Sequence, residues 1–169
     1  MSIADTYYSI FSEYINNNRE LNKIRIDNKL IQSIIDYLPE FYNKNINLTY
    51  RYDPYSLFTY ISIFLSALIN KSSLKEFEIY LDGNNIYPFL GSFLLYKTLK
   101  INAKNEKLIV EFLGYKSYKS TFILNGTAGI FTGAYSVSSK FIVKDYIDKY
   151  VESNMIDGEI IKISDFKYL

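Results

Sequence analysis

The chain has 169 residues, with 19 Lys and Arg against 18 Asp and Glu, and 49% of its residues are hydrophobic. These values are typical of one soluble domain with a sizeable core. Histidine and cysteine are absent, which excludes Ser-His-Asp and Cys-His triads, disulfides and metal centres built from those residues. We therefore expect no cofactor and no metal, and we favour a protein that is not an enzyme.

Residues 1–8 contain no basic segment followed by an apolar run, so we expect no targeting peptide and a cytoplasmic location. The most apolar window, residues 55–69, is interrupted by serines and threonines. It is also shorter than the roughly 20 residues that a membrane-spanning helix needs. We expect a buried helix there and no membrane association. The abundance of Ile, Asn, Lys and Tyr is typical of an A/T-rich genome and favours an archaeal or viral source.

The first part of the chain, residues 1–74, shows mainly helical patterns. Apolar residues spaced three and four apart predict helices over residues 4–16, 26–38 and 55–69. For the second helix, Asp27 is the expected N-cap and Pro39 is expected beyond its end. For the third helix, Asp53-Pro54 is the expected start. Short strands are expected over residues 23–26 and 47–52.

A repeat replaces the helical pattern in the second part, residues 75–169. The tripeptide Phe-x-Gly recurs with spacings of 112−89=23 and 131−112=19 residues, at 89–91, 112–114 and 131–133. A strand pattern in the same register follows each copy, at 98–102, 121–125 and 140–144. We also match residues 79–83 to 122–126, and residues 159–163 to 140–144. These matches make an internal repeat the main organising feature of this part.

A period of about 19 residues predicts one turn of a parallel β-solenoid. The expected fold is therefore α+β, with the helical part packed on a short C-terminal β-solenoid to form one compact domain. Stacking of the turns places Phe141 between Phe122 and Ile160 in a core column. Gly91, Gly114 and Gly133 belong to the repeat, and Gly114 and Gly133 mark corners that need a positive φ or have no room for a Cβ. Lys162 is the polar change expected at the last turn.

Gly126, Gly129 and Gly133 have the spacing G-x-x-G-x-x-x-G. With its flanks, residues 81–144, this segment resembles the GXGXG-type β-helix found in the glutamate synthase C-terminal domain and in the β-helical component of formylmethanofuran dehydrogenase. In those families the module packs against catalytic domains without supplying catalytic residues. The resemblance therefore implies a scaffold with no active site of its own.

Lysines and tyrosines alternate between residues 96 and 119. The candidate binding residues are Tyr96, Lys97, Lys100, Tyr115, Lys116, Tyr118 and Lys119. Lysines that contact phosphates and tyrosines that stack on bases are typical of single-strand binding, so nucleic acid is one expected partner. Lysine also keeps exposed β surface soluble, which is the simpler interpretation.

Carboxylates at the later turns have two interpretations. Asp145, Asp148 and Glu152 would share a face of a helix and could hold a hard cation. Solvated turn residues are the stronger interpretation. Asp82 and Asn125 are expected at equivalent corners as Asx turns.

The function best supported by the sequence is a non-catalytic scaffold or protein-interaction module, which binds a protein partner or further copies of the chain. The alternative is a nucleic-acid-binding protein that uses residues 96–119. A third possibility is a protein that binds or acts on carbohydrate through its tyrosines.

Overall fold

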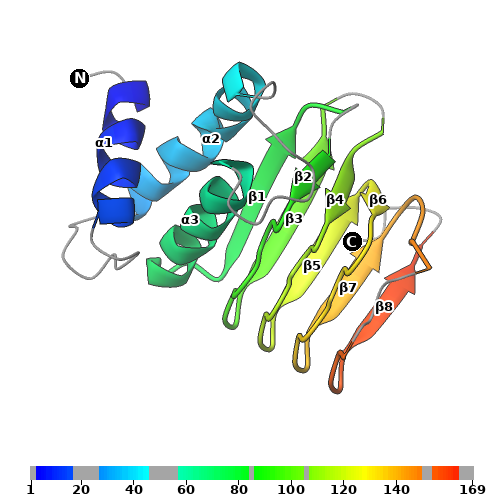
Figure 1. The fold of residues 1–169 in the computed structure, drawn as a ribbon. Coiled ribbons are helices and arrows are strands. Elements are labelled where there is room, and N and C mark those ends of the chain that lie inside the picture. Colours follow the sequence, from blue (N-terminus) through cyan, green and yellow to red (C-terminus); the bar gives the residue numbers. More distant parts are fainter. Residues whose placement is uncertain are drawn as a thin grey trace.

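The computed structural model describes residues 3–16, 27–45, 57–83, 86–104, 107–149 and 154–163. Three helices come first and parallel strands follow, so the protein has the α+β class predicted from its sequence (Figure 1). The helices are α1 (Ile3–Asn16), α2 (Asn28–Asn45) and α3 (Leu57–Lys71). They cover one end of a β-solenoid whose turns continue away from them toward β8 (Figure 1).

Two parallel sheets form the solenoid. The larger sheet has the order β1-β3-β5-β7-β8 and the smaller sheet has the order β2-β4-β6. The strands of the larger sheet are β1 (Glu76–Leu81), β3 (Thr98–Ala103), β5 (Thr121–Asn125), β7 (Lys140–Val143) and β8 (Glu159–Lys162). The strands of the smaller sheet are β2 (Ile86–Pro88), β4 (Ile109–Glu111) and β6 (Thr127–Ala128). Each strand pairs with its counterpart one turn later, which confirms the predicted solenoid.

The register gives the length of each turn. Partners in the larger sheet are 22, 23, 19 and 19 residues apart, as in Glu76↔Thr98, Thr98↔Thr121, Thr121↔Lys140 and Lys140↔Glu159. The expected period of 19 therefore holds for the last two turns, and the first two are longer. The predicted match of residues 79–83 to 122–126 is wrong by two residues, because Ile79 aligns with Ile101 and Ile101 with Leu124. Asp82 and Asn125 are therefore not equivalent corners.

Like residues stack in the solenoid core as predicted. Phe122 pairs with Phe141, and Phe141 pairs with Ile160. Both phenylalanines have no exposed surface. Gly114 has a φ of +64°, and a Cβ there would lie 2.6 Å from the ring of Phe141. Only glycine allows the chain to turn this corner directly beside the aromatic column.

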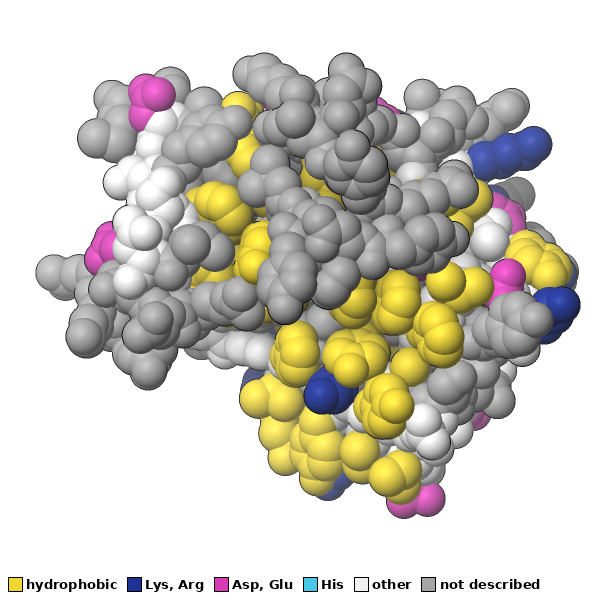
Figure 2. Space-filling model, viewed as in Figure 1, with side chains coloured by type: hydrophobic (Ala, Val, Ile, Leu, Met, Phe, Trp, Pro, Cys, Tyr) yellow, Lys and Arg dark blue, Asp and Glu magenta, His cyan; other side chains and the backbone are white. Residues whose placement is uncertain are grey.

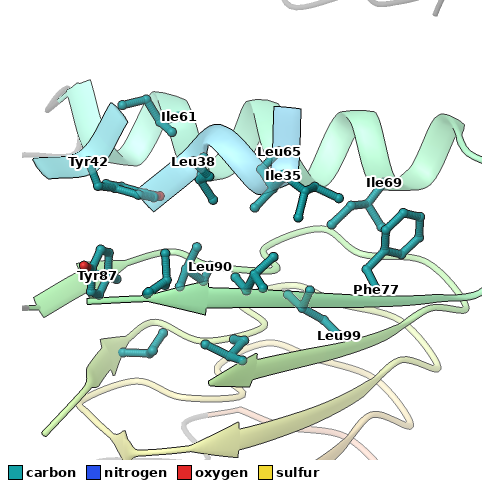
Figure 3. Packing of buried hydrophobic residues seen from close by; sticks show 14 of the residues in the cluster. Ile35, Leu38, Tyr42, Ile61, Leu65, Ile69, Phe77, Tyr87, Leu90 and Leu99 are labelled. Atoms are coloured by element: carbon teal, nitrogen blue, oxygen red, sulfur yellow. The ribbon is translucent and has the colours of Figure 1, made fainter. Parts of the chain in front are cut away.

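The helices close the first turn of the solenoid. Apolar side chains of α2 and α3 face those of β1, β2 and β3, in a single hydrophobic cluster that continues along the solenoid (Figure 3). A buried chain of hydrogen bonds joins these layers. Tyr42 Oη lies 2.8 Å from Ser62 Oγ, which donates to the carbonyl of Pro88 over 2.7 Å. The single proton of the serine hydroxyl is thus used, so Tyr42 donates to Ser62.

Helix α2 begins as predicted and ends later than predicted. The backbone N–H of Leu30 donates to Asp27 Oδ1 over 2.8 Å, which confirms the N-cap. Pro39 lies inside the helix, although proline removes one helical hydrogen bond. Beyond it, Phe41 and Tyr42 are buried against the rest of the core, and this packing offsets the lost bond.

Three predicted features cannot be compared with the structure. The strands expected at 23–26 and 47–52 and the Asp53-Pro54 start lie outside the described residues. Among the helices that the structure describes, none is long and apolar enough to cross a membrane.

Candidate functional site

The corners of the solenoid adopt left-handed backbone conformations at residues other than glycine. Three columns of such residues repeat from turn to turn: Phe89, Phe112 and Phe131; Phe93, Lys116, Tyr135 and Asn154; Tyr96, Lys119, Ser138 and Asp157. Their φ angles lie between 45° and 62°. Glycine or asparagine adopts this conformation with less strain, which costs other residues about 1–2 kcal/mol each. The turn geometry therefore does not account for the aromatic residues and lysines found there.

Aromatic rings from three successive turns gather at these corners. The ring of Phe112 stacks on Phe89 at 4.3 Å with an angle of 12°, and on Phe131 at 5.2 Å with an angle of 25°. Successive turns of a solenoid are about 4.8 Å apart, so the rings follow the spacing of the strands. Both faces of the Phe112 ring are thus covered by its neighbours, and the ring edges point away from the stack.

Tyr115 lies at the centre of the same group. Its ring meets those of Phe89, Phe93 and Tyr135 edge to face, at centroid distances of 5.7, 6.0 and 5.8 Å. Three residues further along each turn, Tyr96 and Tyr118 form another edge-to-face pair at 5.3 Å. We call this whole group the aromatic corner: Phe89, Phe93, Tyr96, Phe112, Tyr115, Tyr118, Phe131 and Tyr135.

Two lysines belong to the aromatic corner. Lys116 Nζ lies 5.4 Å from the centroid of the Tyr115 ring, and Lys119 Nζ lies 5.3 Å from that of Tyr118. Each ammonium group covers a ring face and stabilises the pair by cation–π attraction. Of the seven candidate residues from the sequence, the structure brings five together here: Tyr96, Tyr115, Lys116, Tyr118 and Lys119.

The other two candidates lie elsewhere and do not form part of a binding surface with the tyrosines. Lys97 is only 6% exposed, and its Nζ donates to the carbonyls of Ser72 and Leu74 over 2.7 and 2.6 Å. Burial lowers the pKa of Lys97. Lys100 projects from β3 and forms an ion pair with Glu76 at 2.7 Å. Both lysines are therefore explained by structural contacts.

The aromatic corner is accessible to a partner. Phe93, Tyr96, Phe131 and Tyr135 are 41%, 54%, 38% and 51% exposed. Figure 2 shows hydrophobic side chains gathered over the lower part of the solenoid, with a basic side chain among them. Exposed aromatic groups of this kind mark interaction sites on soluble proteins. Sequence reasoning does not assign Phe89, Phe93, Phe112, Phe131 and Tyr135 to this site, although the recurring Phe-x-Gly tripeptide is an available signal.

The acidic and glycine-rich motifs form neither a metal site nor a phosphate loop among the described residues. No group of three Asp or Glu side chains among them lies close enough to hold a metal ion. Glu152, part of the acidic trio considered from the sequence, lies outside the described residues. Gly126 and Gly129 do not form an open phosphate loop, because the backbone N–H groups of Thr127, Ala128 and Gly129 already donate to the carbonyls of Leu108, Tyr146 and Val110.

Comparison with known proteins finds no matching family model, no matching curated protein and no matching solved structure. The resemblance of residues 81–144 to the GXGXG-type β-helix therefore stays a prediction. The candidate site rests on the geometry described above.

Proposed function

We propose that this protein is a non-catalytic interaction module that binds another protein through the aromatic corner. The observation that carries this proposal is the partly exposed, lysine-flanked aromatic group, six of whose eight residues occupy backbone positions where glycine or asparagine would be less strained. Tyr and Phe are enriched in protein interfaces because they bury a large area with few rotatable bonds. A scaffold role agrees with the resemblance to the GXGXG-type β-helix.

The geometry favours a protein partner over a nucleic acid or a sugar. Bases and sugars stack on open ring faces. Here both faces of Phe112 are covered by phenylalanines, and Lys116 and Lys119 cover one face each of Tyr115 and Tyr118. These three rings therefore offer ring edges and lysine ammonium groups more than open faces. Such a surface fits the apolar side chains and carboxylates of a protein.

The charge at the corner favours a different protein over a second copy of the chain. A symmetric dimer through this surface would place Lys116 and Lys119 of one copy close to the same lysines of the other. Like charges across an interface are unfavourable. We therefore propose a partner with an apolar patch bordered by Asp or Glu.

The test compares two double variants that change the charge equally. Lys116→Glu with Lys119→Glu reverses the charge at the corner, and Lys29→Glu with Lys75→Glu makes the same change at exposed positions elsewhere. The partner is captured with the wild-type chain, identified by mass spectrometry, purified and titrated by calorimetry. The corner variant should bind about tenfold more weakly, equivalent to ~1.4 kcal/mol, and the control variant should bind like the wild type. The free energy of unfolding of the corner variant should fall by no more than about 2 kcal/mol, the combined loss of two exposed cation–π contacts.

A second experiment tests the two alternative functions that the sequence suggests, nucleic-acid binding and carbohydrate binding. Single-stranded oligothymidylate and a soluble polysaccharide are titrated against the wild type and the corner variant by fluorescence anisotropy. Salt-dependent binding of the oligonucleotide that the corner variant loses would replace this proposal with nucleic-acid recognition. Equal partner affinity of all three proteins would also overturn it.

A further inference from the structure

A second surface feature lies at the opposite ends of the strands of the larger sheet. There, where β3, β5 and β7 end, a hollow of about 700 Å³ opens between the turns. Its lining includes Lys107, Ile109, Asn125, Thr127 and Lys144. Pockets that bind small molecules are about 300–1,000 Å³, so this hollow has a suitable size. Because the aromatic corner precedes these strands and the hollow follows them, the two sites are independent.

The connections between the two sheets differ in length beside the hollow. Five residues join β3 to β4 (109−103−1=5), whereas only Gly126 joins β5 to β6 (127−125−1=1). The pairing offset accordingly falls from 23 residues at Asn102↔Asn125 to 18 at Ile109↔Thr127. Leu108, at the end of the longer connection, lies directly beside the short corner, since a Cβ on Gly126 would lie 2.7 Å from Leu108 O. Insertions into a repeat commonly form its binding face.

The charges that line the hollow are unbalanced. Lys107 and Lys144 are both exposed, and neither forms an ion pair with another described residue. Three other lysines of the solenoid do form such pairs, namely Lys100 with Glu76, Lys104 with Asp82, and Lys140 with Glu159. Asp145 is the only acidic residue among the described lining residues. The described residues that line the hollow therefore carry a net positive charge.

Neutral groups in the hollow complement the lysines. Asn125 and Thr127 have no side-chain hydrogen bond to another described residue, and both are partly exposed. Ile109 contributes an apolar wall. Lys107 has a left-handed backbone with a φ of 55°. Lysine gains nothing from that conformation, so a role for its side chain explains it better than the turn does.

We propose that this hollow binds a small organic anion, in which a carboxylate, sulfonate or phosphate group is attached to an apolar body. The anionic group binds Lys107 and Lys144, with Asn125 and Thr127 as hydrogen-bonding partners. The apolar body packs against Ile109. Charge-assisted hydrogen bonds from two lysines are the main source of affinity, and they select anions over neutral molecules of the same shape.

The test uses 1-anilinonaphthalene-8-sulfonate, a fluorescent sulfonate with an apolar body, and its neutral analogue N-phenyl-1-naphthylamine. Both are titrated into the folded wild-type chain, into Lys107→Gln with Lys144→Gln, and into the control Lys29→Gln with Lys75→Gln. The sulfonate should bind one site, and the hollow variant should bind it at least tenfold more weakly. The control should bind it normally. The neutral analogue should bind all three proteins equally weakly.

A nuclear magnetic resonance titration with the same sulfonate locates the site. The amide signals of Asn125 and Thr127 should move on binding, and those of Phe112 and Tyr115 in the aromatic corner should not. The proposal is wrong if the sulfonate shows no saturable binding, if the hollow and control variants bind equally, or if the largest shifts fall at the aromatic corner. The separate partner titration tests the aromatic corner, so failure at the hollow is distinguishable from failure there.

Discussion

The rings of Phe122 and Phe141 lie one above the other in the solenoid core, with centroids 4.9 Å apart and planes inclined by 8°. Both side chains have no exposed surface. Replacing Phe141 with Ala removes one member of this stack and leaves a cavity between Phe122 and Ile160. We expect the free energy of unfolding to fall by roughly 3–5 kcal/mol in urea denaturation. Tyr146→Ala, at a ring that is 56% exposed, is the control and should change it by about 0.5 kcal/mol or less.

Gly114 and Gly133 provide a matched pair, because both have positive φ angles, +64° and +73°. A Cβ on Gly114 would lie 2.6 Å from the Phe141 ring, whereas a Cβ on Gly133 would lie 3.1 Å from it. Both alanine variants share the strain of the left-handed backbone, about 1–2 kcal/mol. Gly114→Ala must also displace a core ring, so its melting temperature should fall further. Equal melting temperatures would mean that the core relaxes around the added methyl group.

The chain of hydrogen bonds through Tyr42, Ser62 and Pro88 predicts unequal effects of two conservative variants. Tyr42→Phe removes a donor and leaves Ser62 bonded to the carbonyl of Pro88, so it should lower the free energy of unfolding by about 0.5–1.5 kcal/mol. Ser62→Ala leaves the buried Tyr42 hydroxyl without its acceptor and should lower it by about 1–3 kcal/mol. Chemical denaturation of the two variants measures both losses in the free energy of unfolding. The reverse order would contradict the assignment of Tyr42 as the donor.

The burial of Tyr42 also predicts that the stability of the protein depends on pH in the alkaline range. Burial raises the pKa of Tyr42 above its ordinary value of 10.0. Its contribution to stability is therefore complete below about pH 10, and it decreases as the pH rises further, because the unfolded chain releases a proton that the folded chain keeps. The decrease is up to ~1.4 kcal/mol per pH unit. Since Tyr42→Phe lacks this proton, the stability difference between wild type and variant should narrow above about pH 10. A constant difference in denaturation across this range would refute the prediction.

Lys97 and Lys100 are three residues apart and should respond differently to replacement by Met. Lys97→Met removes two hydrogen bonds, to the carbonyls of Ser72 and Leu74, and should lower the free energy of unfolding by about 1.5–3 kcal/mol. Lys100→Met removes an exposed ion pair with Glu76 and should change stability little. Thermal and urea denaturation measure both. A gain in stability for Lys97→Met would mean that the burial of its charge outweighs those hydrogen bonds.

The repeat in the sequence is sufficient to predict the parallel solenoid, the stacking of Phe122 on Phe141 and the corners at Gly114 and Gly133. This works because every turn must place a similar residue over its neighbour, so the packing recurs as a period along the chain. The predicted register of β1 is wrong by two residues. Registers that differ by two residues place the same side chains on the same face of the sheet, so the hydrophobic pattern alone cannot distinguish them. The sequence predicts that α2 ends before Pro39, because proline breaks helices. In the structure the helix continues, because the residues beyond Pro39 are buried against other elements.

The fold class and the repeat follow from the amino-acid pattern alone, which also indicates the lysines and tyrosines between residues 96 and 119 as candidates. Only the tertiary structure separated Lys116 and Lys119, which cover ring faces in the aromatic corner, from Lys97, which is buried against the end of α3. It alone also showed that Lys107, Asn125, Thr127 and Lys144 line one hollow. The physical reason is that exposure and pairing depend on contacts between turns about 20 residues apart, which local composition does not encode.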